Sequence, residues 1–151
     1  MKFAVLKAEH GTKLNAIHNH LTYEVYPEKK TSNILDAISN YEEIKKNKEK
    51  IFSTEGNKID KTKTTFPFWP LKKIICLGLN YLDHIKEGGY EIPNYPALFV
   101  RFPSSLIEPN QNMIKPKISE KLDYEAELMV LIGKKTKNVN EKEAEKSVFA
   151  Y

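Results

Sequence analysis

The sequence is poor in the residues that build several kinds of site and anchor. Among its 151 residues, Cys76 is the single cysteine, so the chain can form no internal disulfide and no thiolate cluster for a metal. No apolar run approaches the roughly 20 residues that a membrane-spanning helix needs. Lysines at positions 2 and 7 interrupt the N-terminus too early for a secretory signal. We therefore expect a cytoplasmic protein without a membrane partner, and we interpret Cys76 as a small buried hydrophobic residue.

Arginine is almost absent as well. Lys and Arg together number 24 and the formal net charge is +4, yet Arg101 is the only arginine. Nucleic-acid surfaces usually contain more arginine, because its guanidinium makes paired hydrogen bonds to phosphate and guanine. The lysines also alternate with acids, as in residues 141–146 (EKEAEK). This pattern favours a solvated surface, so we expect no nucleic-acid partner.

The glycines do not form a nucleotide-binding signature. There are six, and none of them belongs to a phosphate-binding loop, a dinucleotide fingerprint or a Gly-x-Ser-x-Gly elbow. With 40% hydrophobic and 29% charged residues, the composition is typical of a globular protein.

Hydrophobic patterning divides the chain near residue 70. The first part is predicted to hold strands at residues 2–8, 14–18 and 21–26, followed by one helix that Thr31 or Ser32 caps and that ends at Phe52. A polar loop at 53–65 leads to residues 66–70 (FPFWP), whose prolines interrupt regular structure. We therefore predict a small α/β domain over residues 1–70.

The second part, residues 71–151, is predicted to be mainly β. An apolar run at 73–79 predicts a strand buried on both faces, and a short helix that Asn80 caps follows at 81–87. A further strand is predicted at 97–100, inside a long loop, and a strong one at 122–133. Asn140 and Glu143 have the spacing of a capping box, which predicts a helix over 141–149. The predicted fold class is α+β, mainly β.

The most informative stretch is Asp123-Tyr124-Glu125-Ala126-Glu127-Leu128. Alternate side chains of a strand share one face, so Asp123, Glu125 and Glu127 are expected on the same side. Two glutamates at that spacing can converge on one ion, and Mg²⁺ or Mn²⁺ accepts such oxygen ligands together with waters. Alternation alone instead favours an antiparallel strand with an acidic solvent face. Against that alternative, the acidic face becomes apolar at Met129 and Leu131.

Three further residues are candidates, each with an ordinary alternative. On a helix His84 and Glu87 are neighbours, so the carboxylate can fix the imidazole tautomer and the histidine can act as a general base. Such a pair is also a common surface feature. Arg101 has the fork of donors that suits a substrate carboxylate, or it forms a surface salt bridge. His18-x-His20 has no third ligand, so we assign it no metal.

Taken in order, these motifs resemble those of one family. The order runs from Lys73-Ile74-Ile75-Cys76-Leu77-Gly78-Leu79-Asn80-Tyr81, His84 and Glu87, through Pro96-Ala97-Leu98-Phe99, Arg101 and Pro103-Ser104-Ser105, to residues 122–128 and Ile132-Gly133-Lys134. This pattern resembles the fumarylacetoacetate hydrolase family from about residue 73 to the last residue. The first 70 residues look more loosely like the smaller N-terminal domain of that family. The resemblance implies that the second part belongs to a β-roll, usually assembled as a homodimer.

The resemblance also implies a chemistry. Glu125 and Glu127 would be two of three carboxylate ligands of Mg²⁺, Mn²⁺ or Ca²⁺. His84 would activate water with Glu87 as its orienting partner, and Tyr81 and Arg101 would bind the substrate. The family's substrates are small 1,3-diketo or 2-oxo acids, whose oxo groups the metal chelates while a C–C bond breaks. The family also includes decarboxylases and isomerases.

The sequence departs from the family pattern at its end. The family's third ligand, an aspartate, and its catalytic lysine lie beyond the position of Tyr151. Asp123 has no counterpart among the family's ligands. We therefore assign no residue of this chain as the third metal ligand or as the catalytic lysine. We therefore expect an incomplete metal-dependent hydrolase, isomerase or decarboxylase. The alternative is a non-catalytic truncated fragment, or one half of a split enzyme that needs a complementary chain.

Overall fold

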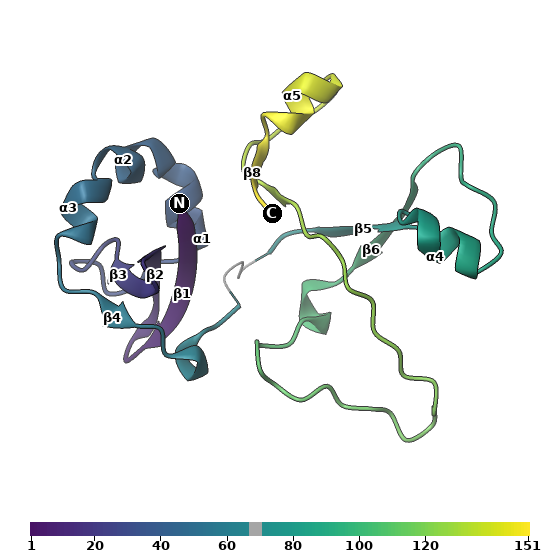
Figure 1. Cartoon of the computed structure of the whole chain (residues 1–151), viewed down its shortest axis with the longest axis horizontal. Helices are drawn as coiled ribbons and strands as arrows, with labels where there is room; N and C mark the ends of the chain where they lie inside the picture. The colour runs from purple at the N-terminus through teal and green to yellow at the C-terminus, as the bar shows by residue number, and fades with distance from the viewer. Residues whose placement is uncertain (67–70) are drawn as a thin grey trace.

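A computed structural model of the chain describes residues 1–66 and 71–151 (Figure 1). Short strands in three small sheets alternate with short helices, which confirms the predicted class, α+β and mainly β. No helix in the described ranges is long and apolar enough to cross a membrane. The break predicted at 66–70 falls mostly on residues outside the described ones. We call residues 1–66 the N-terminal unit.

The N-terminal unit is built on a four-stranded antiparallel sheet in chain order. Its strands are β1 (Lys2–Ala8), β2 (Gly11–His18), β3 (Leu21–Glu24) and β4 (Asn57–Lys58). The three predicted strands are confirmed, although β2 begins three residues earlier than predicted and β3 ends two residues earlier. Asn19 and His20 both have positive φ, 47° and 63°, between the paired ends of β2 and β3. Such a two-residue turn matches the twist of the flanking strands.

Three short helices cover one face of this sheet: α1 (Ile34–Ser39), α2 (Tyr41–Lys46) and α3 (Lys48–Phe52) (Figure 1). The prediction of one continuous helix was therefore wrong. Its breaks fall at Asn40 and Asn47, whose side-chain amides donate to carbonyl oxygens four residues earlier, at 3.0 and 3.1 Å. The backbone N–H groups of both residues still donate to the same carbonyls, at 3.1 and 3.0 Å. The interruption lies in the backbone angles, with φ and ψ of −123° and 23° at Asn40 and −92° and 9° at Asn47. The core that the helices close consists of Val5, Leu14, Ala16, Tyr23, Val25, Ile34, Ala37, Ile44 and Ile51.

The start of α1 also differs from the prediction. Its N-cap is Asn33, which forms a capping box with Asp36, and not Thr31 or Ser32. Ser32 is buried and its hydroxyl oxygen accepts the backbone N–H of Leu14 at 2.8 Å. The Ser32 side chain is therefore committed to the sheet, and the next residue caps the helix.

A two-stranded hairpin follows the N-terminal unit. Strand β5 (Ile74–Gly78) pairs antiparallel with β6 (Ala97–Arg101), and α4 (Leu82–Glu87) lies between them in the chain. The prediction that the first of these strands is buried on both faces was wrong: its residues are alternately half-buried and exposed, and all of β6 is exposed. Cys76 is half-buried rather than fully buried for the same reason.

The strand predicted over residues 122–133 is reduced to its last part. Only β7 (Leu131–Ile132) forms a ladder, with β8 (Val148–Ala150). A strand needs a hydrogen-bonding partner, and residues 122–130 have none among the described strands. Helix α5 (Glu141–Glu145) has the predicted capping box at Asn140, but β8 takes the place of its predicted last turn.

Contacts between described residues join the C-terminal part of the chain to the N-terminal unit. The ring of Phe149 in β8 meets Tyr41 edge to face, with 5.5 Å between the ring centroids. Glu108, in the loop after β6, accepts hydrogen bonds from the Thr65 hydroxyl at 2.7 Å and the Phe66 N–H at 3.1 Å. These contacts hold the loop and the β7–β8 pair against the sheet and helices of the N-terminal unit.

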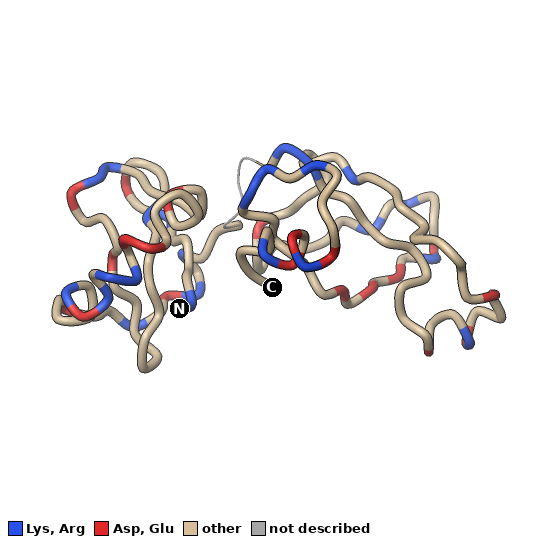
Figure 2. Tube along the Cα trace, turned by 90° about the horizontal axis from the view of Figure 1, so that it is seen from above, with Lys and Arg blue, Asp and Glu red and all other residues tan. Residues whose placement is uncertain are grey.

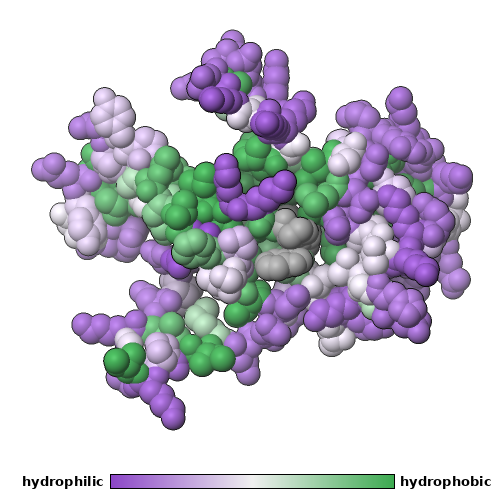
Figure 3. All heavy atoms as spheres, turned by 180° about the vertical axis from the view of Figure 1, so that it is seen from behind, coloured by the Kyte–Doolittle hydropathy of each residue, from purple (hydrophilic) through white to green (hydrophobic). Residues whose placement is uncertain are grey.

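The surface differs between the two parts in hydrophobicity more than in charge. Acidic and basic residues are interspersed along both parts (Figure 2). Large apolar side chains lie exposed mainly between residues 75 and 132, and Figure 3 shows hydrophobic residues gathered across the middle of one face. Tyr95, Ile114 and Ile118 are 84%, 89% and 97% exposed.

Candidate functional site

The turn that ends β5 meets the acidic segment predicted to bind metal. The Tyr81 hydroxyl oxygen accepts the backbone N–H of Leu128 at 3.1 Å. The Asn80 side-chain amide donates to Oε2 of Glu127 at 3.4 Å. Two predicted motifs that lie 47 residues apart in the sequence are therefore in direct contact. Asn80 does not cap the following helix as predicted, because Tyr81 occupies the N-cap position.

Glu125 and Glu127 are exposed on a segment without regular secondary structure. The shared strand face on which their convergence was predicted is thus absent from this segment, since no ladder imposes the alternation there. The described residues contain no group of three or more histidine, cysteine or acidic side chains placed to hold a metal ion. The two carboxylates and the amide oxygen of Asn80 are hard oxygen donors of the kind that Mg²⁺ and Mn²⁺ prefer. Their donor chemistry suits such a cation, but the described residues give the two glutamates no third acidic, histidine or cysteine partner for one.

Helix α4 presents the predicted acid–base pair beside this contact. His84 follows Tyr81 by three residues, and both His84 and Glu87 are exposed. No hydrogen bond or ion pair between these two side chains occurs in the part of the chain that is described, where Lys86 and Asp83 form the ion pair of α4 at 3.9 Å. Ile85, which is 3% exposed, anchors the helix. His84 thus lies three residues after Tyr81 in the chain. The structure does not join its side chain to that of Glu87 by a hydrogen bond or an ion pair.

Arg101 ends β6, opposite Ile74 at the start of β5. Its guanidinium carbon lies 5.8 Å from the centroid of the Phe99 ring, two residues earlier on the same strand. The surface salt bridge that was its ordinary alternative is not formed with any described carboxylate. The guanidinium is exposed and remains accessible to an anion.

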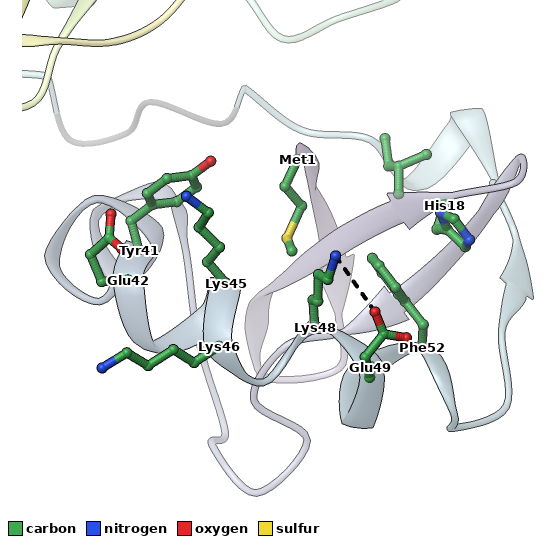
Figure 4. Close-up of a pocket in the computed structure, with 10 residues that line it drawn as sticks. Met1, His18, Tyr41, Glu42, Lys45, Lys46, Lys48, Glu49 and Phe52 are labelled. Carbon is green, nitrogen blue, oxygen red and sulfur yellow. Dashed lines mark ion pairs between the residues drawn. The ribbon is translucent and has the colours of Figure 1, made fainter.

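A hollow of about 300 Å³ lies against the turn after β5. One wall is formed by the end of β5, Asn80 and two residues of α4, and the other by residues 92–96. The second wall was not predicted, because its Pro and Asn content indicates only a loop and gives no sign of which element it faces. A larger hollow of about 690 Å³ lies in the N-terminal unit, between the end of the sheet where β1 begins and β2 ends and the helices α2 and α3 (Figure 4). Its wall includes His18 stacked on Phe52, with 4.5 Å between the ring centroids.

The fold and the sequence together define the class of protein. The chain belongs to the fumarylacetoacetate hydrolase family: the family model for the C-terminal part of fumarylacetoacetate hydrolase matches residues 73–151, about half of the chain. A solved structure of a Mycobacterium smegmatis protein named as an HpcE protein shares the fold, with a TM-score of 0.64 over 95% of this chain and 51% of that one. At 17% identity this likeness concerns the fold alone.

The relatives are similar over about half of the chain or somewhat more. An uncharacterized protein from Methanocaldococcus jannaschii is 48% identical over 79 residues, which are 52% of this chain and 33% of the relative. Fumarylacetoacetate hydrolase domain-containing protein 2 homolog from Dictyostelium discoideum is 44% identical over 62% of this chain and 30% of its own length. Mitochondrial oxaloacetate tautomerase fahd2 from Xenopus laevis is 42% identical over 53% of this chain and 25% of its own length. The matched region thus spans a third or less of each of these relatives.

Proposed function

We propose that residues 73–151 form part of the active site of a metal-dependent enzyme that acts on 2-oxo or 1,3-diketo acids. The reaction is hydrolysis of a C–C bond, or a related isomerisation or decarboxylation. The observation that carries the proposal is the contact of Asn80 and Tyr81 with Glu127 and Leu128, within the region that matches the family. Oxaloacetate tautomerases among the similar proteins favour isomerisation of a 2-oxo acid.

Each candidate residue has a distinct role in this proposal. Glu125 and Glu127 hold Mg²⁺, Mn²⁺ or Ca²⁺, which when bound supplies Lewis-acid stabilisation of charge that develops on the substrate's oxo oxygens. The exposed guanidinium of Arg101 binds the substrate carboxylate. A ring nitrogen of His84 accepts a proton, and Glu87 orients that ring. The Tyr81 hydroxyl oxygen accepts the backbone N–H of Leu128, so the hydrogen of the Tyr81 hydroxyl can be donated to the substrate.

Calorimetric titration of the chain with Mg²⁺ and Mn²⁺ tests the cation site. The double variant Glu125→Ala/Glu127→Ala is expected to lose binding, because both proposed ligands are removed. The matched control is Glu55→Ala/Glu91→Ala, which removes two exposed glutamates elsewhere in the chain. Equal affinity of the wild type and the first double variant would reject the assignment of the metal ligands.

The reaction is tested by following the absorbance of the enol form of oxaloacetate. The protein is expected to accelerate loss of the enol only with Mg²⁺ or Mn²⁺ present, and His84→Asn is expected to abolish that acceleration. A rate that His84→Asn leaves unchanged would remove the histidine from the mechanism.

A second candidate function rests on the exposed apolar side chains between residues 75 and 132. Soluble monomers rarely expose large contiguous apolar patches, so this surface fits a chain that works within an assembly, as a homodimer or with a complementary chain. Sedimentation at several concentrations tests it, and a chain that stays monomeric and cooperatively folded throughout would contradict it.

In the same proposal, residues 1–70 and 71–151 act as separate domains of a cytoplasmic protein. Limited proteolysis tests the division and microscopy of the tagged protein tests the location.

A further inference from the structure

We infer that the hollow of about 300 Å³ beside the turn after β5 receives an uncharged, apolar end of the substrate, remote from its acid group. This inference rests on the proposed function, because it takes the ligand to be a 2-oxo or 1,3-diketo acid. The roles proposed for His84 and Arg101 concern the acid and its reaction, and they leave the rest of the substrate open.

The residues that line the hollow are all uncharged. Leu82 and Ile85 of α4 form part of one wall, and Ile92 belongs to the opposite wall. The side-chain amides of Asn80 and Asn94 add hydrogen-bonding groups. Sites for small molecules usually combine apolar walls with a few polar groups in this way, at volumes from about 300 Å³ upwards.

The two walls belong to one local structure, because the lining residues all fall between positions 77 and 96. At the end of α4, Gly89 has a positive φ of 66°, and the Tyr90 N–H donates to the carbonyl oxygen of Ile85 at 3.0 Å. The chain after α4 therefore turns back towards β6, which pairs with β5 (Figure 1). Ile85 itself is 3% exposed and fixes α4 below the hollow.

The apolar walls leave surface for a ligand to cover. Leu77, Leu82 and Ile92 are 47%, 58% and 65% exposed. An apolar group seated among them would remove this surface from water, which favours binding in proportion to the area buried. A carboxylate in the same place would lose water without gaining a cationic partner from the lining residues, and this costs free energy. The hollow therefore selects an apolar group over a charged one.

The hollow adjoins residues that are proposed to act on the substrate. Asn80 lines it and directly precedes Tyr81, and the wall residues Leu82 and Ile85 belong to the helix that contains His84. An acid whose far end enters the hollow would thus lie along the start of α4.

Arg101 sets the length of the substrate in this arrangement. It pairs with Ile74, whereas Gly78, which lines the hollow, pairs with Ala97. Four residues of strand, about 13 Å, separate these two pairs. An acid held by the guanidinium must therefore extend well beyond the length of pyruvate to place its other end in the hollow.

The binding of two acids that differ at their far end tests the inference. 2-Oxohexanoate ends in a methyl group, and 2-oxohexanedioate has the same carbon chain but ends in a carboxylate. In NMR titrations of the full chain at one Mg²⁺ concentration, 2-oxohexanoate is expected to bind about tenfold more tightly, the gain from burying about two carbon groups. Its terminal methyl is expected to show nuclear Overhauser effects to the methyl groups of Leu82, Ile85 and Ile92.

A charge placed in the wall is expected to reverse this preference. Ile92→Lys puts an ammonium group beside the hollow at a position that is 65% exposed, so the fold can accommodate it. This variant is expected to bind 2-oxohexanedioate more tightly than 2-oxohexanoate. The matched control is Ile107→Lys, since Ile107 is 48% exposed and does not line the hollow. Circular dichroism establishes that both variants are folded.

The outcomes separate this inference from the proposed function. If neither acid binds, the proposed function is wrong and the inference falls with it. If both acids bind but 2-oxohexanedioate binds as tightly as 2-oxohexanoate, or if Ile92→Lys keeps the preference of the Ile107→Lys control, the inference alone is overturned. If the methyl resonances of Leu82 and Ile92 shift with protein concentration in the absence of ligand, another chain covers the hollow, and this also overturns the inference.

Discussion

Glu108 provides the sharpest test of how the C-terminal part is attached to the N-terminal unit. Its carboxylate accepts from the Thr65 hydroxyl at 2.9 and 2.7 Å and from the Phe66 N–H at 3.1 Å. Lys7 lies at the limit of an ion pair, 4.0 Å from Oε2. Glu108→Gln keeps the size of the side chain and removes its charge, so the variant isolates the electrostatic part of the attachment.

The expected magnitude follows from these contacts. A hydrogen bond to a charged group contributes about 1.5–3 kcal/mol in a buried setting. The Glu108 side chain is 36% exposed, so solvent screening reduces each of the two bonds to about 1 kcal/mol. The exposed Lys7 pair adds less than about 0.5 kcal/mol. We therefore expect Glu108→Gln to lower the free energy of unfolding by about 1–2 kcal/mol at pH 7, and Lys7→Ala to change it by less than about 0.5 kcal/mol.

The pH dependence gives a second readout. The hydrogen bond from the Thr65 hydroxyl lowers the pKa of Glu108 most, and the hydrogen bond from the Phe66 N–H and the positive charge of Lys7 also lower it. Burial raises this pKa, but the net result is a pKa below the usual range of a glutamate. A lowered pKa in the folded state means that the stabilisation is complete above about pH 5 and is lost as the pH falls through that pKa. The wild type and Glu108→Gln are thus expected to converge in stability in acid.

Urea unfolding followed by circular dichroism from pH 7 to pH 3 measures both effects. Hydrogen exchange around Thr65 and Phe66 locates them, since those amides are expected to exchange faster in Glu108→Gln. The control is Glu91→Gln, an exposed glutamate in the loop before β6. A stability difference that is below about 0.3 kcal/mol at pH 7, or that stays constant into acid, would refute this account of the attachment.

Three further outcomes are expected. Leu14→Ala, at a fully buried position, lowers the free energy of unfolding by about 2–5 kcal/mol, whereas Leu35→Ala, at a 47% exposed position, changes it by less than about 0.5 kcal/mol in urea denaturation. Burial raises the pKa of Asp36, but hydrogen bonds from Lys29 and the Asn33 N–H outweigh it and leave that pKa lowered. The stabilisation that ionised Asp36 gives the folded state is therefore present above about pH 4 and is lost below it. When the free energy of unfolding is followed into acid, Asp36→Asn is expected to lack this loss. Gly133→Ala places a Cβ 2.8 Å from Cβ of Phe149, which costs about 1–3 kcal/mol and speeds amide exchange in β8; unchanged exchange contradicts this packing.

Much of the N-terminal unit was predictable because its signals are local. Alternating apolar residues and turn residues lie within each hairpin, so β1, β2 and β3 were placed correctly apart from their ends. The helices were less predictable. Periodicity indicated one helix, but the backbone angles at Asn40 and Asn47 depart from helical values and divide it into three.

The candidate residues were named from the sequence, and their roles stay a prediction, whereas their arrangement was not predicted. The motifs around Tyr81, His84, Glu125 and Glu127 stand in the order of the family that the chain belongs to. The contact between Asn80 and Glu127 spans 47 residues of sequence, and no local pattern specifies which distant segments meet. The alternation at residues 122–130 likewise predicted a strand, but a strand depends on a partner that alternation does not reveal.

By itself, the sequence determined the α+β class, the family and the residue types available for chemistry. The class follows from composition and short-range periodicity, and the family follows from the resemblance of the ordered motifs. Each can be read along the chain without knowing which distant segments meet. Only the tertiary structure decided that β5 and β6 are largely exposed, that Glu108 ties the later loop to Thr65, and that Tyr81 meets Leu128. The physical reason is that burial, hydrogen-bond partners and the approach of distant segments depend on how the whole chain packs.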